Sequence, residues 1–349
     1  MKAAWLALLL LAGCASDGSV RGRLHYGTTE APEGPRLVWP AAPEVPRYLY
    51  AGTLIGEPNF VRGNDGSALR ALGRWIAGLD ERPDVPTVLQ RPGVVTGDDA
   101  GRLYVADASR QAVFVFDEPA GELQVWDQAD AARRFRAPAG NALAADRVFV
   151  ADAELGAVFV LGRGGEPRAA WGRGLLKRPT GLARDAATGR LYVADTYAHT
   201  IQVFDDGGTR VATLGRRGTA DGEFNFPTHL AFARGELYVC DTLNQRVQVF
   251  GPEGFRRRIG TRGLVLGDLV RPKGVAVDGD GNVYVVESYH DHLLVFAPDG
   301  RFLLPIGGTG TATGRFYLPA GVWVDARNRV HVADQFNGRV VLFQFLGGG

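Results

Sequence analysis

A short apolar run that ends in an acidic residue occurs six times in this chain of 349 residues. Successive runs end 45, 43, 46, 46 and 47 residues apart, at Asp107, Asp152, Asp195, Asp241, Glu287 and Asp334. A nearly constant period of this length is the signature of a repeat protein, in which each unit buries its apolar surface against its neighbours. The chain must therefore fold as an array of similar units.

Each unit contains the same series of segments, which the third unit shows clearly. Pro179 opens a first apolar segment, "LYVAD" (191–195) is the second, and "IQVF" (201–204) follows after a polar turn. A glycine-containing turn then leads to a fourth segment, such as "RFLLPIG" (301–307). Segments that are apolar without alternation must be covered on both faces. Six such units predict an all-β, six-bladed β-propeller of four-stranded antiparallel blades.

The last unit is too short to hold four strands. After "VVLF" (340–343) only six residues remain, whereas "RYLYAGTLIG" (47–56) matches the fourth segment of other units. We therefore predict a propeller domain over 47–349 in which the N-terminal strand closes the last blade. Residues 57–90 are then an insertion, and apolar residues at helical spacing predict a short helix near 67–79.

The N-terminus predicts export. Lys2 is followed by an apolar run that is too short to span a bilayer and is typical of a signal peptide. The sequence "LAGC" ends at Cys14 and resembles the bacterial lipobox, in which the signal is removed and lipid is attached to the cysteine. We therefore predict a lipoprotein signal peptide over 1–13 and a lipid anchor on Cys14; an ordinary cleaved signal with an incidental cysteine is the alternative. The proline-rich segment 14–46 predicts a tether.

Composition limits the partners. Without residues 1–13 the chain loses Lys2 alone among its charged residues, which leaves 38 basic and 38 acidic side chains and no net charge. A neutral chain gives no reason to expect nucleic acid binding. The only cysteine besides Cys14 is Cys240, so no intramolecular disulfide is expected. These features predict a monomeric propeller in the bacterial cell envelope, facing the periplasm or in the outer membrane.

Two units carry a more specific motif. The segments "DTLNQRVQVF" (241–250) and "DQFNGRVVLF" (334–343) resemble the NHL repeat, in which an Asn-x-Arg pair follows the aspartate of the second strand. The whole layout is similar to that of bacterial NHL-repeat lipoproteins, a resemblance that implies a six-bladed propeller and no particular reaction. The first unit departs from the motif, with Arg110 and Ala112 at the Asn and Arg positions.

One face of such a fold carries the turns between second and third strands together with the connections into the next blade. Aromatic and arginine side chains there favour binding, because these residue types are enriched at interface hot spots. The residues predicted to form this candidate binding face are Tyr197, His199, His229, Arg178, Arg271, Tyr289, His290 and Phe336.

Three of these histidines raise the alternative of a metal site. His199, His229 and His290 fall on neighbouring units, and three imidazoles can hold Zn²⁺ with one position open for water. Zinc or calcium would be the cofactor of such a site; no cofactor is predicted otherwise. An enzyme of this kind would resemble an amidating lyase or a lactonase, although glycine stands at 181, 274 and 321, where the lyase has histidines.

The sequence thus predicts a membrane-anchored propeller that acts as a binding scaffold for an envelope protein, peptide or other ligand. The alternative is a metal-dependent propeller enzyme with its site near His229.

Overall fold

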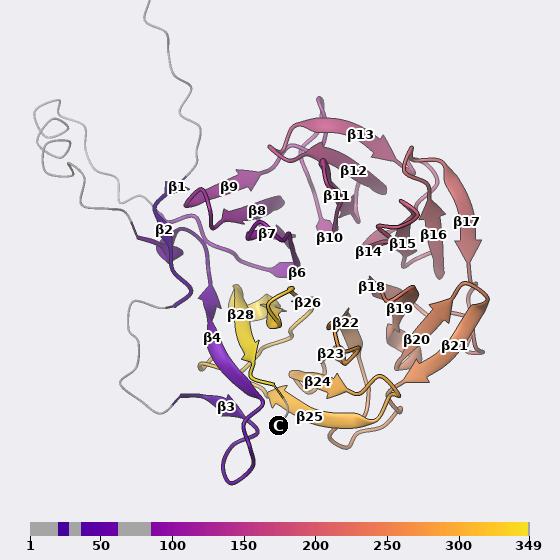
Figure 1. Cartoon of the computed structure of the whole chain (residues 1–349). Helices are drawn as coiled ribbons and strands as arrows, with labels where there is room; N and C mark the ends of the chain where they lie inside the picture. Colours follow the sequence, from indigo (N-terminus) through magenta and orange to yellow (C-terminus); the bar gives the residue numbers. More distant parts are fainter. Residues whose placement is uncertain (1–19, 28–35, 62–84, 348–349) are drawn as a thin grey trace, which may run out of the picture.

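A computed structural model describes residues 20–27, 36–61 and 85–347 of the chain. In this part of the chain six β-sheets surround a central axis, and a seventh sheet of two strands lies beside them (Figure 1). The prediction of an all-β, six-bladed propeller is confirmed. The signal peptide, Cys14 and the helix predicted near 67–79 lie outside the described residues. Within those residues no helix is both long and apolar enough to cross a membrane.

The strands occupy four positions in the blades, from the axis outward. The innermost strands are β6 (Pro92–Gly97), β10 (Pro138–Leu143), β14 (Pro179–Arg184), β18 (Pro227–Ala233), β22 (Pro272–Val277) and β26 (Val322–Val324). The second strands are β7 (Arg102–Asp107), β11 (Arg147–Asp152), β15 (Leu191–Asp195), β19 (Glu236–Asp241), β23 (Val283–Glu287) and β27 (Arg329–Asp334). Each innermost strand begins one blade, and the blades are numbered one to six in chain order.

The outer half of each blade follows the same plan. The third strands are β8 (Ala112–Asp117), β12 (Ala157–Gly162), β16 (Thr200–Phe204), β20 (Arg246–Gly251), β24 (His292–Phe296) and β28 (Arg339–Phe345). The fourth strands are β9 (Glu122–Trp126), β13 (Pro167–Trp171), β17 (Arg210–Leu214), β21 (Gly254–Ile259), β25 (Phe302–Gly307) and β4 (Tyr48–Leu54). Short 3-10 helices are η1 (Glu57–Asn59), η2 (Thr242–Asn244) and η3 (Gln335–Asn337).

The ring is closed by the N-terminal strand, as predicted. Strand β4 pairs antiparallel with β28, so that Leu54 lies opposite Val340 and Tyr48 opposite Phe345. The Tyr48 hydroxyl also forms a hydrogen bond of 3.0 Å with the hydroxyl of Tyr284 in blade five. The last blade thus combines strands from both ends of the chain (Figure 1).

Parts of the segment 14–46, which was predicted to be a tether, add further strands to the propeller. Strand β1 (Val20–Arg21) pairs with β9, and β3 (Val38–Trp39) pairs with β4. Strand β2 (Arg23–Leu24) pairs with β5 (Phe60–Val61) to form the two-stranded sheet. Strands β1 and β2 therefore lie at the junction of blades six and one, whereas β3 extends the outer edge of blade six.

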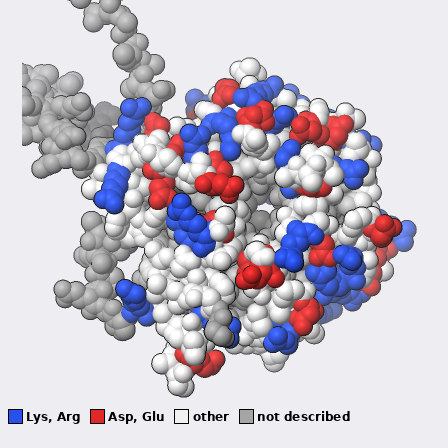
Figure 2. Space-filling model, viewed as in Figure 1, with Lys and Arg blue, Asp and Glu red and all other residues white. Residues whose placement is uncertain are grey.

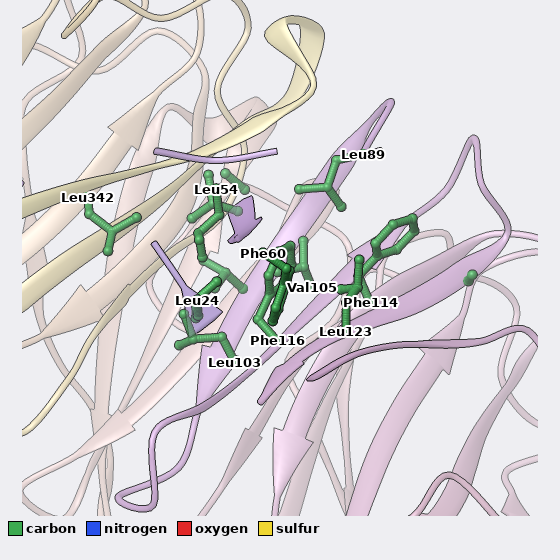
Figure 3. Close-up of a cluster of buried hydrophobic side chains, with 14 residues drawn as sticks. Leu24, Leu54, Phe60, Leu89, Leu103, Val105, Phe114, Phe116, Leu123 and Leu342 are labelled. Carbon is green, nitrogen blue, oxygen red and sulfur yellow. The ribbon is translucent and has the colours of Figure 1, made fainter. Parts of the chain in front are cut away.

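An apolar cluster at that junction explains why the segment packs there. Leu24 and Phe60 lie among the side chains of blades one and six (Figure 3), and the Phe60 ring stacks on that of Phe116 at 6.2 Å. Asn59 fixes the backbone beside them. Its Oδ1 accepts hydrogen bonds from the N–H groups of Ile55 and Gly56, and its Nδ2 donates to the carbonyls of His25 and Thr53. All hydrogen-bonding capacity of this buried amide is therefore used.

The acidic residue at the end of each second strand has a structural role. In blade one, Asp107 Oδ2 accepts hydrogen bonds from the N–H groups of Gln90 and Arg91, and Oδ1 accepts from Ser109 and Arg110. One carboxylate thus joins the turn to the connection that enters its own blade.

The NHL motif strengthens this connection. In blade four, Asn244 donates to Asp241 and to the Gly218 carbonyl, while Arg246 donates to Asp241 and to the Ala220 carbonyl. In blade six, Asn337 and Arg339 bind Asp334 in the same way. The consensus residues of the repeat therefore hold the fold, and function must be sought elsewhere.

Candidate functional site

One face of the propeller carries the turns between second and third strands and the connections between blades; we name it the turn face. The second residue after the strand-end acid is a large apolar residue on four successive blades. Tyr197, Leu243, Tyr289 and Phe336 stand there with 54, 52, 55 and 48% of their surface exposed. Blades one and two have Ser109 and Glu154 instead. An apolar arc, defined by these four residues, therefore covers blades three to six.

The structure confirms that Tyr197, Tyr289 and Phe336 are exposed, and it adds Leu243 to them. Sequence reasoning does not single out Leu243, because leucine is neither aromatic nor basic. Its position in the repeat does identify it, because Leu243 is the second residue after Asp241, as Tyr197 is the second residue after Asp195.

Arginines pack on two members of the arc. The guanidinium carbon of Arg178 lies 5.1 Å from the centre of the Tyr197 ring, and that of Arg91 lies 5.0 Å from the centre of the Phe336 ring. Arg271 precedes Pro272 at the corresponding place in blade five and is exposed. A guanidinium over an aromatic ring offers both apolar area and hydrogen-bond donors to a ligand.

His199 has a different role from the one predicted. It is buried, with 8% of its surface exposed, and its Nδ1 accepts a hydrogen bond of 3.2 Å from the Phe226 N–H group at the entrance to blade four. Asp291 accepts from the Leu318 N–H group in the same manner at the entrance to blade six. Burial also lowers the pKa of His199. This histidine therefore links two blades and does not form part of the exposed surface.

His229 lies on the axis. Its Nε2 is 3.2 Å from the carbonyl oxygen of Gly93, which belongs to blade one on the opposite side of the ring. A carbonyl can only accept, so Nε2 carries the proton; Nδ1 is buried and has no hydrogen-bond partner among the described residues. Burial lowers the pKa of His229 from 6.5 to about 4. The imidazole is therefore neutral at physiological pH.

The residue equivalent to His229 in blades two, three, five and six is glycine, and the reason is steric. A Cβ atom on Gly181 would lie 2.3 Å from the Thr228 carbonyl oxygen, and one on Gly274 would lie 2.4 Å from that of Ala320. Neighbouring inner strands thus approach closely at these glycines. The inner strands surround the axis. The His229 ring spans this axis and helps to line a central cavity of about 320 Å³.

His290 lies at the edge of the turn face. Its ring contacts that of Tyr289 at 4.9 Å, and it lines a hollow of about 440 Å³ together with His292, Arg315 and the exposed loop residues Leu264 and Leu266. The predicted trio of His199, His229 and His290 is not brought together as a metal site. In the described ranges, no group of three His, Cys, Asp or Glu side chains could hold a metal ion.

Charge is mixed over the molecule. Lysine and arginine side chains alternate with aspartate and glutamate over the face shown in Figure 2, in keeping with a net charge of +1 for the whole chain. No broad basic surface that would attract a polyanion is visible in this view.

The fold and the repeats define a class, the six-bladed β-propeller, and comparison with known proteins agrees. A family model described as "NHL repeat" matches residues 176–204 and 224–250, and a second, described as "6-bladed beta-propeller", matches 270–348. These matches identify NHL repeats in blades three and four and a six-bladed-propeller segment in blades five and six. No curated protein matches it significantly in sequence.

Solved structures share the fold at low sequence identity. An auxiliary nutrient binding protein from Bacteroides thetaiotaomicron is 14% identical, with 74% of this chain and 70% of that chain covered and a TM-score of 0.58. Virginiamycin B lyase from Staphylococcus aureus is 9% identical over 74% and 96% of the two chains, with a TM-score of 0.53. A chain of a nidogen/laminin complex is 21% identical over 69% and 84%, also at 0.53. Identities this low show the common fold alone.

Proposed function

We propose that the protein is a binding module of the bacterial cell envelope, which holds a protein or peptide ligand on its turn face. The observation that supports this most directly is the apolar arc. Its four side chains occupy equivalent turns on successive blades and leave about half of their surface in water, more than the packing of the blades requires. Large apolar side chains left in water on one face are typical of surfaces that bind a partner.

The arginines of the turn face fit the same proposal. Arg178 is held over Tyr197 and Arg91 over Phe336, so both guanidinium groups are already positioned before a ligand arrives. Preorganised aromatic and arginine side chains give affinity at a low entropic cost. Solved propellers with related folds include nutrient binding proteins as well as lyases. The binding role is favoured here because His199 and His229, the residues first considered for chemistry, bond to backbone groups.

Location is part of the proposal. A signal peptide over 1–13 and lipid on Cys14 would hold the propeller at the membrane, and the ligand would then be an envelope protein or peptide. We expect one propeller to act as a monomer, since each blade already has both neighbours in the closed ring.

The test is a capture experiment with purified variants. Replacing Tyr197, Leu243 and Tyr289 together by serine should reduce capture of envelope proteins at least tenfold, because buried aromatic and aliphatic anchors carry most of the affinity of an interface. The melting temperature should stay nearly unchanged. Val211→Ser is the matched control, because Val211 is 50% exposed on the outermost strand β17, away from the turn face.

Capture that is equal for the triple variant and the wild type would contradict the proposal. The enzymatic alternative is checked in the same preparation by metal analysis. Stoichiometric metal that is present in the wild type and lost in His229→Ala would favour the enzyme.

A further inference from the structure

The fourth strands of blades one, two and three differ at one equivalent position. Trp126, Trp171 and Leu214 each pair with the second residue of the neighbouring third strand. The ring centre of Trp126 lies 5.7 Å from that of Tyr104 in the second strand of its blade. In the same way, the ring centre of Trp171 lies 5.1 Å from that of Phe149. Blade three therefore has a smaller side chain where the two preceding blades have an indole.

Each indole also fills a space beside the next blade. A Cβ atom on Gly165, in the β12–β13 turn, would lie 2.7 Å from the ring of Trp126. One on Gly208, in the β16–β17 turn, would lie 2.4 Å from the ring of Trp171. Gly254 is the equivalent residue at the start of β21, and a Cβ atom there would have no described atom beyond its chain neighbours within 4 Å. The space that an indole fills beside blades two and three is thus open beside blade four.

A groove of about 510 Å³ lies at this junction of blades three and four. Tyr192, which is the counterpart of Tyr104 and Phe149, forms part of its wall. The Tyr192 ring stacks on that of Phe232 at 5.5 Å, with 11° between the two planes. Both rings are only partly buried. The apolar lining of the groove includes Tyr192, Leu214, Phe232, Leu237 and Phe250.

Charge at the groove does not favour an ionic ligand. Asp185 and Arg190 are the charged residues that line it, and their charges are opposite. The stacked rings are already in place, and aromatic surfaces of this kind gain affinity from contact with another ring. The groove is therefore suited to an uncharged aromatic group.

The junction of blades six and one shows how an extended segment covers the same kind of place. Gly121 stands between β8 and β9, as Gly254 stands between β20 and β21. Its carbonyl accepts a hydrogen bond of 2.8 Å from the Gly22 N–H group, and β1 pairs with β9 beside it. Strand β17 is the outermost strand of blade three among the described residues. Its free edge can therefore take an added strand as β9 takes β1.

We propose that the groove between blades three and four is a second binding site, in which an extended peptide of a partner inserts a tryptophan side chain beside Tyr192. The indole would take the place that Trp126 and Trp171 take in the two preceding blades, and the peptide backbone would lie along β17. The groove lies between the β14–β15 and β20–β21 turns, on the face opposite the turn face. The proposal therefore does not depend on the function proposed for the apolar arc.

The test uses the full chain and three uncharged probes: acetyl-Thr-Ser-Trp-Ser-Thr-amide, the same peptide with leucine in place of tryptophan, and N-acetyltryptophanamide. Binding is followed by ligand-observed NMR. The tryptophan peptide should bind at least tenfold more tightly than the leucine peptide, because its ring can stack on Tyr192. It should also bind more tightly than N-acetyltryptophanamide, because its backbone can pair with β17.

Leu214→Trp is the decisive variant. Its own indole should fill the groove as in blades one and two, so the affinity for the tryptophan peptide should fall at least tenfold. The melting temperature should stay the same or rise, because an open space is filled. Leu303→Trp is the matched control, since Leu303 is 39% exposed on the fourth strand of blade five. This control variant should bind the peptide like the wild type.

A cross-linking measurement on the wild type guards against a variant that fails to fold. The tryptophan of the peptide is replaced by the photoreactive aromatic residue p-benzoylphenylalanine, and the labelled site is identified by mass spectrometry. The label should lie on residues of the groove, such as Tyr192, Leu214 or Pro252. An excess of the tryptophan peptide should suppress it.

Several results would overturn the proposal: equal binding of the tryptophan and leucine peptides, equal binding by the wild type and a folded Leu214→Trp variant, or a label outside the groove. N-acetyltryptophanamide that binds as tightly as the peptide would refute the extended backbone and identify a free aromatic compound as the ligand. Wild-type dimers that Leu214→Trp dissociates in size-exclusion chromatography would replace the partner by a second copy of the chain.

Discussion

The titration of His229 gives a quantitative test of the contact across the axis. Burial lowers the pKa of this side chain from 6.5 to about 4 in the folded chain. Between these two pH values the unfolded chain binds a proton at His229 and the folded chain does not. The free energy of unfolding is therefore independent of His229 above about pH 7, and it decreases as the pH falls through this window.

The size of the effect follows from the two pKa values. A pKa difference of one corresponds to about 1.36 kcal/mol, so His229 should lower the free energy of unfolding by about 2.5 kcal/mol between pH 7.5 and pH 4.5. Burial also lowers the pKa of His292 and raises that of Asp241, so these groups add to the pH dependence of stability. Their contributions cancel when the wild type and a variant that lacks His229 are compared at both pH values.

The assay is urea unfolding followed by tryptophan fluorescence, with His229→Gln as the reference protein. Glutamine can donate a hydrogen bond to the Gly93 carbonyl and does not titrate, so this variant should lose about 2.5 kcal/mol less than the wild type. If both proteins lose the same free energy between the two pH values, His229 is not buried against Gly93 and the description of the axis is wrong.

Three further predictions concern the N-terminal part of the chain. Asn59→Asp should lower the free energy of unfolding by more than about 3 kcal/mol, because a carboxylate would face the carbonyls of His25 and Thr53; Asn59→Ala should cost less, and the reverse order in urea unfolding would contradict the hydrogen bonds described. Leu24→Ala should cost about 2–5 kcal/mol, whereas an unchanged melting temperature would show that this segment is a free tether. Cys14→Ser should abolish incorporation of a labelled fatty acid in cells; equal labelling of the variant and the wild type would rule out lipid attachment at Cys14.

The fold could be predicted from the sequence because it is repeated. Six copies of one pattern make the assignment of each strand more certain than a single copy would. The last unit lacks its fourth strand, so that strand had to come from elsewhere in the chain. The choice of β4 as that partner followed from the likeness of 47–56 to 301–308. Pairing of β4 with β28 confirmed it.

Features that occur once were harder to predict. Nothing in the repeat indicates that Leu24 finds a place between blades one and six, since the contact joins residues far apart in the chain. Asn59 is a single polar residue whose four partners are known only once the backbone has folded. His199 looked like an exposed turn residue, yet a left-handed backbone, with φ of 56°, accompanies its burial against blade four.

The arrangement of the turns explains why a ligand site should lie on this face. On blades one, two and five the strand-end acid accepts a hydrogen bond from the N–H group of the second residue after it, at Ser109, Glu154 and Tyr289. This bond fixes the backbone of that residue and makes no use of its side chain. Serine, glutamate, leucine and aromatic residues can therefore occupy the position without disturbing the blade, which leaves the choice among them open to the binding role proposed above. On blades four and six the N–H groups of Leu243 and Phe336 donate instead to the carbonyls of Asn225 and Tyr317. There too the backbone is held without the side chain, and four of the six positions are occupied by large apolar residues.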